Sequence, residues 1–154
     1  MASPRPQANQ KLYLARIVAA SWRRELTAEL IPATVLAQAF DGAARDHLRA
    51  AYGWFLLEIM QSETLPEIPP SSCADLPTLA EGKAVPGEIR ELEQLERGGW
   101  LAEMLAAPAA VAQLKAPGSL AMSVSQVSGP DFIDQSIDNL QQIFDRMSDS
   151  LDEY

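Results

Sequence analysis

Histidine and cysteine, two side chains that often build metal centres and active sites, are almost absent from this sequence. It has one of each, His47 and Cys73, among 154 residues. A single cysteine excludes an intramolecular disulfide and is typical of a reducing compartment, so we expect a cytoplasmic protein. One histidine and one cysteine also cannot supply a zinc cluster of His and Cys ligands. We therefore expect no metal and no other cofactor.

Long apolar runs and a surplus of positive charge are lacking as well. No segment holds about eighteen consecutive apolar residues, which predicts that the chain does not span a membrane. Arg16 interrupts the apolar run near the start, and Trp22-Arg23-Arg24 stands where a signal peptide would have small residues, so we expect no signal peptide. The formal net charge of −9 opposes binding to the phosphates of nucleic acid. We expect neither a membrane nor nucleic acid as a partner.

The sequence motifs of common catalytic sites are missing too. Gly98-Gly99 lacks the Lys-Ser/Thr that completes a phosphate-binding loop, and no G-x-S-x-G nucleophile elbow occurs. A carboxylate-bridged metal centre in a helical bundle would need Glu-x-x-His, but Ala44 stands three residues before His47. Cys73 lies in a proline-rich segment, and nothing in the sequence brings it to His47. These absences favour a protein that is not an enzyme.

The residues that are abundant favour helices. Ala, Leu, Glu and Gln are common, β-branched residues are few, and 47% of the chain is apolar. We predict one all-α domain over residues 1–154, an antiparallel bundle of four main helices with one or two short extra helices. The expected segments of the first half are a loose arm at 1–7, helices at about 8–26 and 32–61, and a loop at 63–86 with a short helix near 74–81. Those of the second half are a helix from Pro86-Gly87 to Gly98-Gly99, a helical piece from Trp100, a loop at 116–129 and a last helix at 130–151. Residues 120–127 partly alternate and could pair as a strand, although a loop is the preferred interpretation.

The second predicted helix carries two polar side chains on its apolar face. His47 and Glu58 share a stripe with Leu36, Phe40, Ala43, Ala44, Ala51 and Trp54, widened by Leu48 and Phe55, whereas Gln38, Arg45, Asp46 and Arg49 fall on the far side. A buried polar group needs a partner, so we predict that Glu58 is mostly buried and bonded to the first helix. The expected partners are Arg16, Arg23 and Tyr13.

His47 and Glu58 allow a structural or a functional interpretation. A histidine on an apolar helix face is usually a core residue with satisfied nitrogens, and less often a ligand or a base. The functional alternative is a small-molecule pocket around His47, Tyr52 and Trp54, in a binding protein or an enzyme. The candidate binding residues are therefore His47, Tyr52, Trp54, Glu58, Tyr13 and Arg16.

Charge is distributed unevenly along the chain. Residues 1–24 carry five basic and no acidic side chains, whereas residues 131–154 carry seven acidic ones against Arg146. The simpler interpretation is that the two ends dock on each other or are solvated, and the alternative is two binding surfaces for different partners.

The last predicted helix has an apolar stripe of nearly heptad spacing. Its members are Ile133, Ile137, Leu140, Phe144, Met147 and Leu151. Such a stripe is too regular to stay exposed. We predict that it packs mainly within its own chain, with a dimer seam as the alternative, which leaves the oligomeric state open between monomer and dimer.

Several short segments resemble a family of small helical proteins without an established activity, from pseudomonads and their relatives. They are Asn9-Gln10-Lys11-Leu12-Tyr13, His47-Leu48, Glu58-Ile59, Leu65-Pro66, Trp100-Leu101-Ala102 and the aromatic residue Tyr154. The resemblance covers about residues 8–107 and, more weakly, the last helix, and segments 67–85 and 108–129 depart from it. It implies a bacterial, cytoplasmic setting, includes His47 and Glu58 among the shared positions, and assigns no catalytic residues.

The function expected from these observations is that of a non-enzymatic bacterial interaction or adaptor protein. It would use its acidic last helix or the basic face of its first helix to bind an unknown protein partner. The alternative stays the small-molecule pocket around His47.

Overall fold

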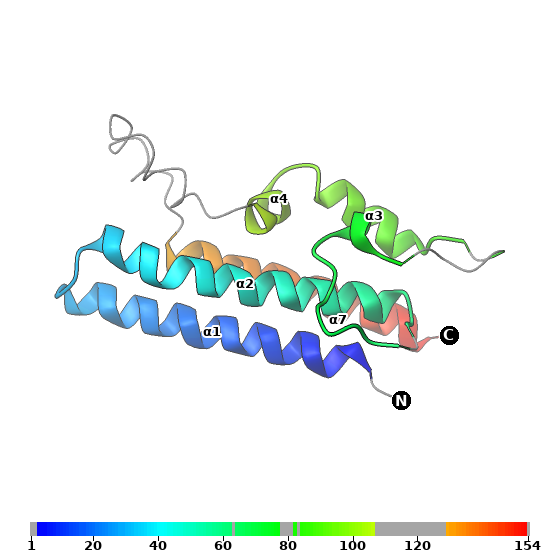
Figure 1. The fold of residues 1–154 in the computed structure, drawn as a ribbon, viewed down its shortest axis with the longest axis horizontal. Helices are drawn as coiled ribbons and strands as arrows, with labels where there is room; N and C mark the ends of the chain where they lie inside the picture. The colour runs from blue at the N-terminus through cyan, green and yellow to red at the C-terminus, as the bar shows by residue number, and fades with distance from the viewer. Residues whose placement is uncertain (1–2, 63, 78–81, 83, 107–128, 154) are drawn as a thin grey trace.

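The computed structural model describes residues 3–62, 64–77, 82, 84–106 and 129–153. The regular structure of these residues is helical throughout, in the order α1 (Pro4–Ala28), α2 (Ala33–Ile59), the 3-10 turn η1 (Cys73–Asp75), α3 (Gly87–Leu95), α4 (Trp100–Leu105) and α7 (Pro130–Asp152). Figure 1 shows α1 and α2 side by side with α7 behind them, and α3 and α4 on the side of α2 away from α1. The all-α prediction is confirmed. The strand considered at 120–127 and the loop at 116–128 lie outside the described residues.

Helix α1 begins at Pro4, so the prediction of a loose arm over residues 1–7 is wrong for residues 4–7. Ser3 is the N-cap, and its Oγ accepts a hydrogen bond from the backbone N–H of Arg5 at 3.3 Å. Proline suits the first helical position because its missing N–H would have no partner there. The serine before the proline is therefore a helix start signal, which outweighs the interpretation of the two prolines as a flexible arm.

The three long helices do not form a fully antiparallel set. Residues 29–32 turn the chain back between α1 and α2, so these two helices run in opposite directions (Figure 1). Arg5, near the start of α1, pairs with Asp152 at the end of α7. Arg23, near the end of α1, pairs with Asp131 at the start of α7. Thus α1 opposes both neighbours, while α2 and α7 run the same way and are separated in the sequence by the short α3 and α4.

The helical elements between α2 and α4 are much shorter than α1 and α2. Helix α3 starts at the predicted Gly87, and Gly99 separates it from α4 with a φ of 80°, a conformation that favours glycine. The short helix expected near 74–81 is a single 3-10 turn at Cys73–Asp75, with Ser72 at its N-cap position but no side-chain cap bond. Residues 78–81 lie outside the described residues.

The core lies between α1, α2 and α7, and α3 and α4 add to it. Phe55 of α2 stacks on Phe144 of α7 with ring centroids 4.0 Å apart. The α7 stripe is buried within its own chain from Ile133 to Met147, which confirms the prediction of intrachain packing. Helix α2 is covered on all sides over residues 51–57, where residues 69–70 approach it closely.

Candidate functional site

Glu58, the carboxylate expected to need a partner, is mostly buried, with its side chain 15% exposed. The prediction of a partner on the first helix is correct, but the residue is Arg5 and not Arg16, Arg23 or Tyr13. The guanidinium of Arg5 lies 3.1 Å from Oε1 of Glu58, and the Ser3 hydroxyl donates to Oε2 at 3.1 Å. Arg5 also binds Asp152, and the hydrogen bond to Asp152 is the largest cause that raises the pKa of Arg5. This arrangement is a structural clamp between both ends of the chain and the end of α2.

His47 is partly buried and is not a core residue, so it lies at the edge of the apolar stripe on which the sequence placed it. The same helix phase placed Ala43 inside, whereas it is exposed. Burial and the nearby positive charge of Lys11 lower the pKa of His47, and the carboxylate of Asp46 opposes them. His47 is therefore neutral at neutral pH, since even its ordinary pKa is about 6.5.

Tyr52 is fully buried and belongs to a small polar cluster with Glu96 and Cys73. Its hydroxyl donates to Oε1 of Glu96 at 2.6 Å, and the backbone N–H of Cys73 donates to the same oxygen at 2.9 Å. The Cys73 thiol lies 3.7 Å from the Tyr52 hydroxyl and 3.8 Å from the Ile89 carbonyl oxygen. Burial raises the pKa of Tyr52, and burial also raises the pKa of Cys73 to about 12. Both groups are thus held in their protonated, unreactive forms, and the cluster fixes η1 and α3 to α2.

Arg45 is a buried charged residue, whereas the helical pattern of the sequence predicted it on the exposed side of α2. Its Nε lies 2.9 Å from the carboxylate of Asp41, and both side chains are about one-tenth exposed. Its Nη1 donates to the backbone carbonyl of Glu103 in α4 at 2.5 Å, and its guanidinium lies 5.0 Å from the ring centroid of Phe132 in α7. The i, i+4 spacing of Asp41 and Arg45 was the available signal. This pair joins α2, α4 and α7.

The remaining candidates are spread over the molecule. Trp54 is buried in the core, Tyr13 is exposed on α1, and Arg16 lies 3.8 Å from Asp138 at the outer limit of an ion pair. The surface pockets described below are lined by residues other than His47, Tyr52 and Trp54. The structure therefore brings none of the six candidates together except through their shared helices.

An exposed apolar surface, which we call the open end, lies where α1 turns into α2. Leu30 is 83% exposed, and Ile31 and Val35 are also exposed. A depression of about 500 Å³ at this turn is lined by Leu26, Glu29, Leu30, Ile31, Pro32 and Ala33. Other large exposed apolar side chains of the described residues are Tyr13, Ile17, Ile68 and Val85, which lie in other segments. Single exposed apolar side chains are ordinary, whereas a group of them marks a binding surface.

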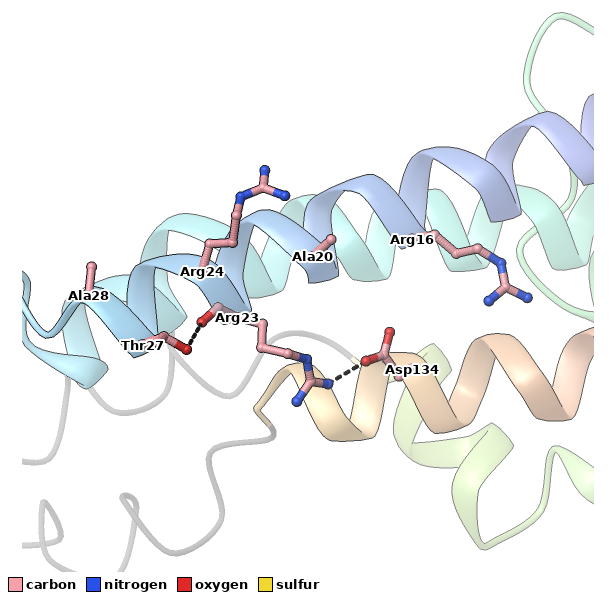
Figure 2. A pocket seen from close by; sticks show the side chains of 7 residues that line it. All are labelled: Arg16, Ala20, Arg23, Arg24, Thr27, Ala28 and Asp134. Carbon is pink, nitrogen blue, oxygen red and sulfur yellow. Dashed lines mark hydrogen bonds and ion pairs between the residues drawn. The ribbon is translucent and has the colours of Figure 1, made fainter.

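A second depression, which we call the arginine groove, adjoins the open end on α1. Its volume is about 640 Å³, and it is lined by Arg16, Ala20, Arg23, Arg24, Thr27, Ala28 and Asp134 (Figure 2). Arg23 points to Asp134 of α7, whereas Arg24 points away from α7. The Nη2 atom of Arg24 donates to the Ser21 hydroxyl at 3.0 Å.

The basic first helix and the acidic last helix dock on each other, as the simpler interpretation of the charge pattern proposed. Arg23 binds both Asp131, at 2.8 Å, and Asp134, and these hydrogen bonds raise the pKa of Arg23. Arg5 and Arg16 add pairs with Asp152 and Asp138 further along the same two helices. Most of these side chains are half-exposed, so the pairs set the register of α1 against α7 more than they stabilise it.

Sequence comparison identifies the family of the chain. A family of unknown function, DUF6586, matches residues 1–154. The chain belongs to this family. No curated protein and no solved structure matches it. The family carries no assigned activity. The pseudomonad origin that the resemblance implied stays a prediction.

Two absences among the described residues concern membranes and metals. No helix among them is long and apolar enough to cross a membrane. No group of three or more His, Cys, Asp or Glu side chains there is arranged to hold a metal ion.

Proposed function

We propose that this member of the DUF6586 family is a non-enzymatic interaction protein of the bacterial cytoplasm that binds another protein through its open end. The exposed Leu30, Ile31 and Val35 carry this proposal, because they lie close together in the connection between α1 and α2 and in the first turn of α2. The partner we propose presents apolar side chains next to acidic ones. Arg24 and the arginine groove lie beside the open end and match such acidic groups in charge.

The buried polar groups support a binding role over catalysis. Tyr52, Cys73 and Glu58 are three side chains whose chemistry an enzyme could use, and each contacts partners that fix helices to one another. A protein partner is favoured over nucleic acid, because the net charge of −9 opposes a polyanion. The cytoplasmic setting is supported by Cys73, a free and buried thiol.

Site-specific photo-crosslinking in the native host tests this proposal. A photo-crosslinking residue at position 30 should give a discrete adduct with one other protein, whereas the same residue at the exposed position 94 on α3 should not. The partner found in this way should bind the purified chain, and Val35→Asp should weaken that binding by about tenfold or more, the scale of one interface anchor. An adduct that contains only a second copy of this chain, or equal adducts at both positions, would contradict the proposal.

A further inference from the structure

Two arginines of the arginine groove, Arg16 and Arg24, form weak intramolecular ion pairs or none among the described residues. Arg23 is saturated by Asp131 and Asp134. Arg16 lies at 3.8 Å from Asp138, and no carboxylate of the described residues forms an ion pair with Arg24, which donates to Ser21. An arginine prefers planar, two-pronged pairing with a carboxylate, so Arg16 and Arg24 can accept better partners than they have.

The residues between the two arginines leave room for a chain. Arg16, Ala20, Arg24 and Ala28 follow one another at intervals of four, so they form a single row along α1. At 1.5 Å per residue the Cα atoms of Arg16 and Arg24 are about 12 Å apart. Ala20 lies between them with only a methyl group, and Figure 2 shows its short side chain between the long ones. An extended segment spans about 12 Å with roughly four residues.

We propose that the arginine groove binds the carboxylates of a short acidic segment of a partner protein, and that Asp134 of α7 is an internal competitor at the same site. This inference rests on the proposed interaction function and names the chemistry of the partner. Asp134 lines the groove and holds Arg23, so an acidic segment meets a carboxylate already in place. A short acidic segment is favoured over nucleic acid, because Arg16 and Arg24 offer two separate cations, whereas binding to a phosphate backbone needs a longer row of them.

If Asp134 competes with the peptide, substitutions of Arg24 and of Asp134 should change the affinity for the peptide in opposite directions. The probe is a fluorescein-labelled oligoglutamate peptide, titrated with the full chain at low ionic strength and followed by fluorescence anisotropy. Arg24→Gln should weaken binding by about three- to fivefold, the scale of one exposed ion pair. Asp134→Asn should strengthen binding by a similar factor, because it removes a repelling carboxylate and leaves Arg23 paired with Asp131 alone.

Two control variants change the same charges elsewhere. Arg146→Gln removes an exposed arginine that pairs with Glu91 at 2.7 Å, and Asp145→Asn removes an exposed carboxylate that accepts from Gln141. Each control alters the net charge as its test variant does, so a purely global effect of charge would appear equally in both. We expect Arg146→Gln and Asp145→Asn to bind the peptide as the original chain does.

Three outcomes would overturn the inference. They are no binding of the peptide by the original chain, equal effects of Arg24→Gln and Arg146→Gln, and tighter binding of duplex DNA than of oligoglutamate. The result is separable from the proposed function. Peptide binding with no adduct at position 30 would refute the open end as the contact, whereas an adduct without a groove effect would refute only the groove.

Discussion

The two ends of the α1–α2 hairpin are built from the same two helices, but one end is covered by other segments and the other end is exposed. We call the end that contains Arg5 and Glu58 the closed end, because residues 69–70, η1 and α3 cover α2 there. At the open end Leu30 and its neighbours face solvent. Covering an apolar face stabilises the fold, and leaving it bare costs that stabilisation. The comparison teaches that stability is concentrated at the closed end, which leaves the open end available for binding.

The largest expected difference between the two ends concerns thiol reactivity. In a Leu30→Cys variant, the new thiol should react with a disulfide reagent at about pH 8 on the order of a thousandfold faster than Cys73. The reason is that burial raises the pKa of Cys73 to about 12, whereas an exposed thiol has a pKa of about 8.5. The kinetics of colour release should then show one fast and one very slow thiol. Two thiols of similar rate would show that the closed end opens readily.

Glycine substitutions in α2 should have opposite signs at its two ends. A Cβ added at Gly53 would lie 2.1 Å from the carbonyl oxygen of Pro70, so Gly53→Ala should destabilise the protein by about 2–3 kcal/mol. Gly42→Ala meets nothing within 4 Å and should stabilise the helix by about 0.5–1 kcal/mol. Urea unfolding followed by circular dichroism measures both. A neutral Gly53→Ala would mean that the covering segment moves away at little cost.

The ion pair at the closed end and a pair midway along α1 should also differ in their contribution to the free energy of unfolding. Glu58→Ala should cost about 1–2 kcal/mol, because it removes a carboxylate whose side chain is only 15% exposed and leaves Arg5 with Asp152 alone. Asp138→Ala removes a half-exposed partner 3.8 Å from Arg16 and should change the free energy of unfolding by less than about 0.5 kcal/mol. Equal losses in chemical denaturation would remove the distinction between a buried clamp and a surface pair.

The smallest effect is expected from His47, which lies near the middle of α2. Burial and Lys11 lower the pKa of His47 in the folded state, so the unfolded chain binds a proton first as the pH falls below about 6.5. Protonation therefore favours unfolding, and stability that is fully present above about pH 6.5 is lost as the pH falls towards the folded pKa. His47→Gln should lose less stability than the original chain between about pH 7.5 and about pH 5.5. Parallel pH profiles would contradict this assignment.

The long helices could be predicted from sequence wherever one face of a helix meets one environment. The stripe of α7 is regular because a single apolar face packs on α1 and α2, and its bounds were predicted within one residue. The phase of α2 failed because α2 is covered on several sides. Arg45 was assigned to solvent, yet α4 and α7 bury it beside Asp41. An amphipathic pattern therefore predicts which side chains of a helix are buried only when the helix has one buried face and one exposed face.

The candidate site could be predicted less well, for two physical reasons. Pairing depends on the register between helices, so the sequence indicated that Glu58 needs a cation but could not select Arg5 over Arg16. Exposure of an apolar side chain has no local signal, since Leu30 and Ile31 in a short connection fit a buried turn equally well. Only the lack of a covering segment among the described residues distinguishes them, and that is a property of the tertiary structure.

The bridge from Arg5 to Glu58 and Asp152 has a practical consequence for handling the protein. It places the first turn of α1 and the last turn of α7 together at the closed end, as Figure 1 shows. An affinity tag, a dye or a surface linker attached at either end will therefore point away from Leu30 and Ile31. The molecule can be immobilised by its tail with the open end directed into solution, which is the geometry that a biosensor requires.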